Sequence, residues 1–202
     1  MDMKTIGIVV LVIALAVAIY MEVQKRTTCA KLEAYLREGD LEKYLALLDR
    51  PLTHVLYPKY NVLFMRLNAM LAMDDVERTA RIIREMGSLK MNDKQKMALA
   101  AKAFAFYVEI EDEPHARQVL EYLEANADES MVRANRRTYE IFLKGSFAYI
   151  DEMERALSGA QSVEEALLCQ MLAVQYDNKG DKIRSASYRE RAERLVDAAM
   201  SK

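Results

Sequence analysis

CQMLAVQYDNKGD, at residues 169–181, is the segment from which the architecture of this chain is most readily inferred. Its apolar residues recur at intervals of three and four, as on one face of an α-helix. Gly180 then supplies a residue that tolerates the left-handed conformation in which many helices end. Asp181 follows it, and aspartate is a preferred cap for the start of a helix. The segment therefore predicts a helix, a tight turn and a second helix.

The same kind of turn recurs along the chain at nearly constant spacing. The candidate turns are Gly39-Asp40, Asp74-Asp75, Glu111-Asp112, Gly145-Ser146 and Gly180-Asp181. They are separated by 35, 37, 34 and 35 residues, and a fixed period in this range is typical of stacked helix pairs. No segment alternates apolar and polar residues as a half-buried strand would. We therefore expect an all-α fold.

Amphipathic spacing predicts ten helices in five pairs. Their expected positions are 29–38, 41–49, 59–73, 75–86, 93–110, 114–126, 129–144, 147–157, 162–179 and 182–200. Each apolar stripe covers one side of its helix, so every helix needs a neighbour to bury that side. Most of the 13 methionines fall at core spacing, and Cys169 lies on a core stripe and should be buried.

At these positions the chain resembles the tetratricopeptide repeat family. The last unit carries the resemblance best, through Cys169, Leu172, Ala173, Tyr176, Gly180, Asp181, Ser185, Arg189 and Ala192. The first unit keeps Tyr35, Gly39 and Asp40, and the third keeps Tyr107 and Ala116. No unit has the motif's tryptophan. The resemblance implies that residues 27–202 form an α-solenoid of about five antiparallel helix pairs, and an irregular helical bundle is the alternative.

The first 26 residues predict a membrane anchor. Residues 5–21 carry no charge, between Lys4 on one side and Lys25 and Arg26 on the other. These 17 residues are close to the roughly 20 that usually span a bilayer, and the flanking basic side chains can extend toward the headgroups. We expect membrane contact through residues 5–23. A signal peptide cleaved after Ala16-Val17-Ala18 and a buried core helix are the alternatives.

The charges beside the apolar segment predict the topology. Lys25, Arg26, Lys31 and Arg37 follow it, whereas only Lys4 precedes it. Basic flanks tend to stay inside, so we expect a single-pass protein of the cell membrane with its domain in the cytoplasm. The two cysteines are far apart in sequence, which fits a reducing compartment. No Gly or Pro lies between Met21 and Gly39, so the anchor can continue into the first helix of the domain.

Composition and motifs argue against several functions. A net charge of −2 gives no basic bias toward nucleic acid. His54 and His115 have no metal-ligand spacing, and the glycines are scattered, so no phosphate loop is formed. We expect no catalytic set, cofactor, metal or small-molecule substrate. Two arginine clusters, Arg133, Arg136 and Arg137 and then Arg189, Arg191 and Arg194, are interpreted as solvated faces or as contacts for acidic peptides or lipid headgroups.

The resemblance also implies a groove lined by the first helix of each pair. Its partner-binding positions fall on Asn61, Phe64, Asn68, Asn135, Tyr139, Gln170 and Asp177, and the third unit places Ala98, Ala101, Ala105 and Val108 there. Asparagine amides can donate to and accept from a peptide backbone. The expected function is a membrane-tethered scaffold or adaptor that binds a protein or peptide. The alternative is an assembly or quality-control factor of the same fold on the outer side of the membrane.

Overall fold

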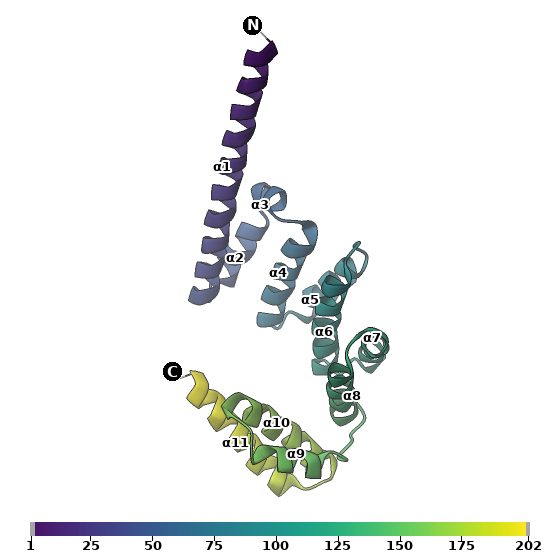
Figure 1. Ribbon diagram of the computed structural model, residues 1–202. Coiled ribbons are helices and arrows are strands. Elements are labelled where there is room, and N and C mark those ends of the chain that lie inside the picture. Colours follow the sequence, from purple (N-terminus) through teal and green to yellow (C-terminus); the bar gives the residue numbers. More distant parts are fainter. Residues whose placement is uncertain (1–2, 201–202) are drawn as a thin grey trace. The chain divides into compact units, whose positions relative to one another are not determined.

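The computed structural model describes the backbone of residues 3–200 and the side chains of residues 11–161 and 163–199. The helices are α1 (Met3–Glu38), α2 (Leu41–Leu48), α3 (Pro51–Leu56), α4 (Lys59–Ala72), α5 (Val76–Gly87), α6 (Asp93–Glu109), α7 (Glu113–Asn126), α8 (Glu129–Leu143), α9 (Ile150–Leu157), α10 (Ser162–Asn178) and α11 (Lys182–Met200). The described residues contain no strand, which confirms the all-α prediction. The chain divides into two compact units, Met1–Leu99 and Ala100–Lys202 (Figure 1).

The five predicted turns coincide with the residues that have left-handed backbone conformations. Within the described residues, positive φ angles occur at Gly39 (71°), Asp74 (52°), Glu111 (56°), Gly145 (66°) and Gly180 (85°). Each is the first residue of a predicted turn dipeptide. Asp74 and Glu111 adopt this conformation although a Cβ makes it costly by about 1–2 kcal/mol. The turn between paired helices therefore keeps its left-handed residue even where that residue is not glycine.

Four of the five turns also share their hydrogen bonds. In each, the aspartate N–H donates to the carbonyl five residues earlier: Asp40 to Tyr35 (2.9 Å), Asp75 to Met70 (3.1 Å), Asp112 to Tyr107 (2.8 Å) and Asp181 to Tyr176 (2.8 Å). Each aspartate side chain accepts from the backbone N–H three residues later, at Lys43, Arg78, His115 and Arg184. These contacts satisfy groups at both helix ends, and they repeat as the tetratricopeptide-like spacing predicts.

The fourth turn differs from the others, and the helix predicted at 147–157 begins later than expected. The Ser146 N–H donates to Glu140 O, six residues back, and α9 begins only at Ile150. The Tyr149 N–H is instead satisfied by the side chain of buried Gln175, at 2.9 Å. A contact from a distant helix therefore moves the start of α9.

Helix α3 was also missed, because residues 51–58 were expected to form only a connection. Pro51 stands at its first turn, where proline fits a helix well, and Tyr57 ends it in an extended conformation. Buried Thr53 donates through Oγ1 to the carbonyl of Leu47 at 2.7 Å. Six residues are too few for a periodic apolar pattern, so packing rather than periodicity reveals this helix.

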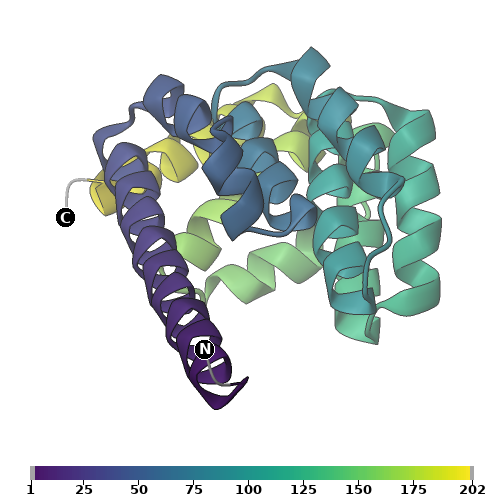
Figure 2. The same ribbon diagram turned by 90° about the horizontal axis from the view of Figure 1, so that it is seen from above.

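Helix α1 continues without a break from the predicted anchor into the first domain helix, and in both views it extends well beyond α2–α5 of its own unit (Figures 1 and 2). Residues 11–20 are all exposed. Over the part of the chain that is described, no helix reaches the length and apolarity needed to span a membrane. The side chains of residues 1–10, which begin the predicted anchor, lie outside that part.

Each unit has its own core. In the first, Leu48, Val62, Leu67, Met70 and Met86 are among the most deeply buried side chains. In the second, the core cluster comprises Ile141, Ile150, Met153, Leu168, Met171, Leu172 and Tyr176. The predicted burial of Cys169 is confirmed. The amphipathic stripes thus face inward, as their spacing indicates.

A network of polar contacts links the last hairpin, α10–α11, to α9. The Tyr176 and Tyr188 rings stack at 5.6 Å, and both hydroxyls donate to Glu154, at 2.5 and 2.9 Å. Burial first, and then the Glu154 carboxylate, raise the pKa of Tyr188 to about 12. The Arg184 guanidinium lies over the Tyr176 ring at 4.4 Å. This network joins α9, α10 and α11.

Changing Gly180 to alanine tests the turn geometry. A Cβ at Gly180 would meet nothing within 4 Å, so the expected loss of about 1–2 kcal/mol in the free energy of unfolding comes from the positive φ alone. Gly159→Ala is the matched control, since it has equal space and no positive φ, and it should be neutral or stabilising. Urea unfolding in mild detergent, followed by circular dichroism, measures both. An equal loss of stability in both variants would contradict the assignment of the Gly180 effect to its positive φ angle.

Candidate functional site

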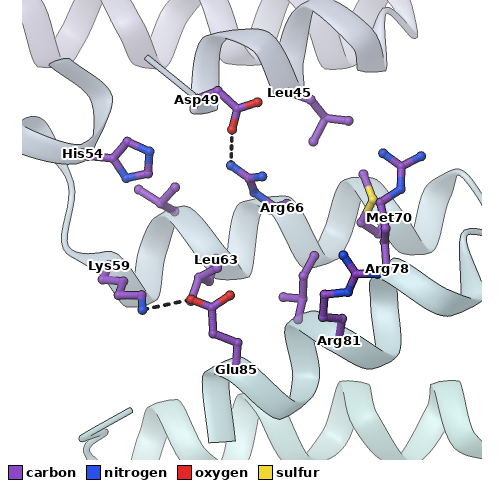
Figure 3. Close-up of a pocket in the computed structure, with 12 residues that line it drawn as sticks. Leu45, Asp49, His54, Lys59, Leu63, Arg66, Met70, Arg78, Arg81 and Glu85 are labelled. Carbon is purple, nitrogen blue, oxygen red and sulfur yellow. Dashed lines mark hydrogen bonds and ion pairs between the residues drawn. The ribbon is translucent and has the colours of Figure 1, made fainter. Parts of the chain in front are cut away.

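A hollow of about 440 Å³ opens among α2, α3, α4 and α5 of the first unit (Figure 3). We call it the basic hollow. It is lined by Leu45, Asp49, His54, Lys59, Val62, Leu63, Arg66, Met70, Arg78, Arg81, Ile82 and Glu85. Its size is that of a small ligand or of a few peptide side chains.

The lining combines apolar contact with positive charge. Buried Val62, Leu63, Met70 and Ile82 provide the apolar part. Lys59 and Arg66 enter from α4, and Arg78 and Arg81 from α5 (Figure 3). The four cations exceed the two carboxylates that line the same space. The hollow therefore suits a group with both an apolar portion and a negative charge.

Arg66 is the most constrained of these cations. Its Nη2 pairs with Asp49 at the end of α2, and its side chain is 29% exposed. Its Nε is buried, and no hydrogen-bond acceptor in the described part of the chain reaches it. Because a buried donor without a partner costs free energy, such a group points to an acceptor that completes the site.

The other cations are held by exposed ion pairs. Lys59 pairs with Glu85 at 2.9 Å, Arg78 with Asp75 at 2.5 Å and Arg81 with Glu77 at 2.8 Å. The backbone N–H of Arg78, and then its guanidinium, lower the pKa of the Asp75 carboxyl. Exposed pairs of this kind contribute about 0–1 kcal/mol. An arriving carboxylate can therefore compete for these cations at small cost.

Sequence reasoning missed the basic hollow. The arginines that it singled out are Arg133, Arg136, Arg137, Arg189, Arg191 and Arg194. Arg78 and Arg81 are three residues apart and so share one helix face, which is a weak indication in the sequence of a basic surface there. It could not be joined to Arg66, since the packing of α2, α3, α4 and α5 brings these residues to one place.

Comparisons with known proteins add the following findings. No protein-family model matches the chain, and no curated protein matches it. A solved structure titled "MamA MSR-1 C2" is similar over 87% of this chain and 98% of its own length, with 18% sequence identity and a TM-score of 0.46. At that score the likeness says nothing about partners or activity.

The predicted groove positions in the first unit lie on the other side of α4 from the basic hollow. Asn61 and Asn68 are exposed, and Phe64 is half-buried with its ring stacked on Tyr60 at 5.6 Å. With about 3.6 residues per turn, these positions point away from Leu63 and Arg66. The predicted groove and the basic hollow are therefore different surfaces of one helix.

The second unit places its predicted groove residues in varied environments. Asn135 is half-buried and donates its amide to the carbonyl of Met131 in its own helix, at 2.8 Å. Tyr139 is buried, and its hydroxyl donates to Glu113 at 3.2 Å, so its ring serves packing rather than an open contact area. Gln170 is exposed, and Asp177 pairs with Lys182 at 2.6 Å.

The positions expected to be bare and apolar in the third hairpin differ in exposure. Ala101 and Ala105 are exposed and Ala98 is half-buried, whereas Val108 is buried. Small exposed side chains on α6 leave its surface open without giving it a hydrogen-bonding group. These positions thus offer contact area but no chemical specificity.

The cluster of Arg133, Arg136 and Arg137 lines a second hollow, of about 350 Å³, with Tyr149 and Glu152. Each arginine pairs with one glutamate: Arg133 with Glu129 (2.7 Å), Arg136 with Glu124 (2.7 Å) and Arg137 with Glu152 (3.0 Å). On the lining itself, the three arginines stand against one carboxylate, that of Glu152, and the Nε of Arg137 is buried without an acceptor among the described residues, like that of Arg66. This hollow differs from the basic hollow because it lacks a floor of buried aliphatic side chains. We use it below as a control surface.

Neither histidine has the surroundings of a metal ligand. His54 is exposed at the edge of the basic hollow, and His115 contacts Asp112 at 2.7 Å and stacks on Tyr107 at 4.9 Å. Within the described residues, no group of three or more metal-ligating side chains gathers.

Proposed function

We propose that this protein is a non-enzymatic, membrane-tethered interaction module that binds an acidic segment of a protein partner in the basic hollow. The observation that carries the proposal is the junction of an apolar floor, four cations and the unsatisfied Nε of Arg66 in one open space. A peptide with neighbouring acidic and apolar residues matches all three features.

The chemistry of Arg66 favours a carboxylate as the bound group. Guanidinium binds carboxylate through two parallel N–H donors, and such charge-assisted hydrogen bonds are stronger than neutral ones. The Nε of Arg66 is buried and has no acceptor of its own in the described part of the chain, so a turn of the Arg66 side chain toward the hollow would let an arriving acidic side chain accept from it. Apolar side chains beside that acid would then cover Leu63 and Ile82.

The tether is proposed from α1. Its described apolar side chains, among them Leu11, Val17 and Ile19, are exposed to solvent rather than packed on the domain. A helix that is apolar on every face is suited to lipid. The basic residues after the apolar segment support a cytoplasmic placement of the domain, in which the hollow would meet cytoplasmic partners.

Replacing Arg66 by glutamine tests the hollow. The probe is a fluorescein-labelled peptide that alternates glutamate and leucine, and its binding to the full chain in detergent is followed by fluorescence anisotropy. Loss of a charged hydrogen bond should weaken binding about tenfold or more. Binding should also fall with added salt, because salt screens the interaction between exposed charges.

Arg137→Gln is the matched control, since Arg137 is also an ion-paired arginine that lines a hollow, with a side chain 28% exposed and a buried Nε that has no acceptor within the described residues. It should bind the probe as the unchanged protein does. Circular dichroism shows whether each variant is folded. The proposal would be contradicted if the Arg66 variant bound the probe as well as the unchanged protein, or if the Arg137 variant lost as much binding. Equal affinity for the same peptide with lysine in place of glutamate would contradict it too.

A further inference from the structure

Helix α3 packs against α1 at the basic end of the apolar segment. The Tyr57 hydroxyl, directly after α3, donates to the backbone carbonyl of Lys25 at 3.0 Å. α3 and α1 are in direct contact (Figure 1). Lys25 and Arg26 are the side chains expected at headgroup level if the apolar segment enters a bilayer. In that arrangement the end of α3 would lie at the level of the membrane surface.

α3 has one face fixed to the domain and another that is apolar and exposed. Thr53 is buried and bonded to Leu47, which holds the helix in place. Val55 is 69% exposed and Leu52 is 38% exposed. These two residues are three positions apart and share a side of the helix. α3 is thus rigidly held while presenting apolar side chains outward.

The charges around this face complement an anionic surface. Lys25, Arg26, Arg50 and Lys59 are exposed near α3 or at its contact with α1. Arg26 and Lys59 are held in exposed pairs with Glu22 and Glu85, and Asp49 pairs with Arg66. Exposed pairs are weak, so headgroup phosphates can compete for Arg26 and Lys59. Basic side chains close to a membrane are attracted to anionic headgroups by about 1 kcal/mol each.

We propose that α3 is a second membrane contact, in which Leu52 and Val55 enter the lipid interface while the basic residues around them meet anionic headgroups. This inference rests on the tether proposed above. α1 would hold the protein at the membrane, and α3 would set the orientation of the first unit on its surface. Amphipathic elements that lie in the interface bind through this combination of apolar area and positive charge.

The chain contains no tryptophan, so a single introduced tryptophan reports its own surroundings. The full-length Val55→Trp variant is reconstituted in vesicles of phosphatidylcholine and phosphatidylglycerol, with or without lipids brominated near the headgroup. The brominated lipids should quench most of the tryptophan emission. Without them, the emission should lie at shorter wavelength than that of a tryptophan in water. Removing phosphatidylglycerol should reduce both effects, because the headgroup charge is then lost.

Val76→Trp is the matched control. Val76 is another exposed valine of the first unit, at the start of α5. It is separated from α3 by the length of α4, whose 14 residues span about 21 Å. Its emission should be unaffected by brominated lipid.

The possible outcomes separate the two proposals. If the protein does not float with the vesicles in a density gradient, the proposed tether is wrong, and the inference about α3 is overturned with it. If it floats and the two tryptophans are quenched equally, or Val55→Trp is unquenched, the α3 contact is wrong and the tether stands. A docked protein partner on α3 would give an unquenched Val55→Trp in pure lipid vesicles, which also overturns the inference.

Discussion

Leu172→Ala is expected to lower the free energy of unfolding by about 2–5 kcal/mol, the range found for buried leucines that leave a cavity. Leu172 has 0% exposure, and it lies in the cluster formed by α8, α9 and α10. The surrounding residues come from three helices, so they cannot all move to fill the space. Equilibrium urea unfolding in mild detergent measures the loss.

Leu167→Ala is the control on the same helix. Leu167 is 57% exposed, and its truncation removes the same atoms and introduces the same helix propensity. Its expected effect is within about 0.5 kcal/mol, as for other surface substitutions. A similar loss in both variants would mean that helix propensity or the denatured state, rather than burial, decides the effect.

A chain that begins at Met21 is expected to move almost completely from the membrane fraction to the supernatant. This truncation removes most of the apolar segment but keeps Lys25, whose carbonyl accepts from Tyr57. The α1–α3 contact is therefore preserved, and the change in partitioning reports the apolar segment itself. Membranes from cells that produce each protein are separated by centrifugation before and after a carbonate wash.

The topology is tested on the full-length chain. A protease added outside intact cells should leave the domain uncut, because we propose that it lies in the cytoplasm. Digestion without lysis would instead favour the assembly or quality-control factor on the outer side. In the fractionation experiment above, recovery of the full-length chain in the supernatant would show that the proposed tether is wrong.

Much of the local structure could be predicted because it depends on nearby residues. Gly39, Gly145 and Gly180 adopt positive φ angles, and glycine allows this conformation without a steric penalty. Asp40 and Asp181 cap the helices that follow them. The first expected helix, 29–38, is the end of the longer α1, and α9 begins later than expected; the other expected helices begin and end within about two residues of their predicted bounds.

Predictions were less successful where a distant contact competes with a local preference. Ser146 has the chemistry of a helix cap, yet Gln175 satisfies the backbone of Tyr149 and α9 begins later. Tyr139 was expected to line a groove, but it is buried with its hydroxyl on Glu113. In both cases a partner at least 26 residues away decides the outcome.

The sequence by itself determined most of the helices, the positions of their turns and the period of the hairpins, because backbone conformation and apolar spacing act over a few residues. Only the tertiary structure placed Asp49, Arg66 and Arg81 around one hollow, and only it placed α3 beside Lys25. The side chains that form these surfaces come from separate helices. Their convergence depends on how buried side chains pack between helices, which no local pattern of residues records.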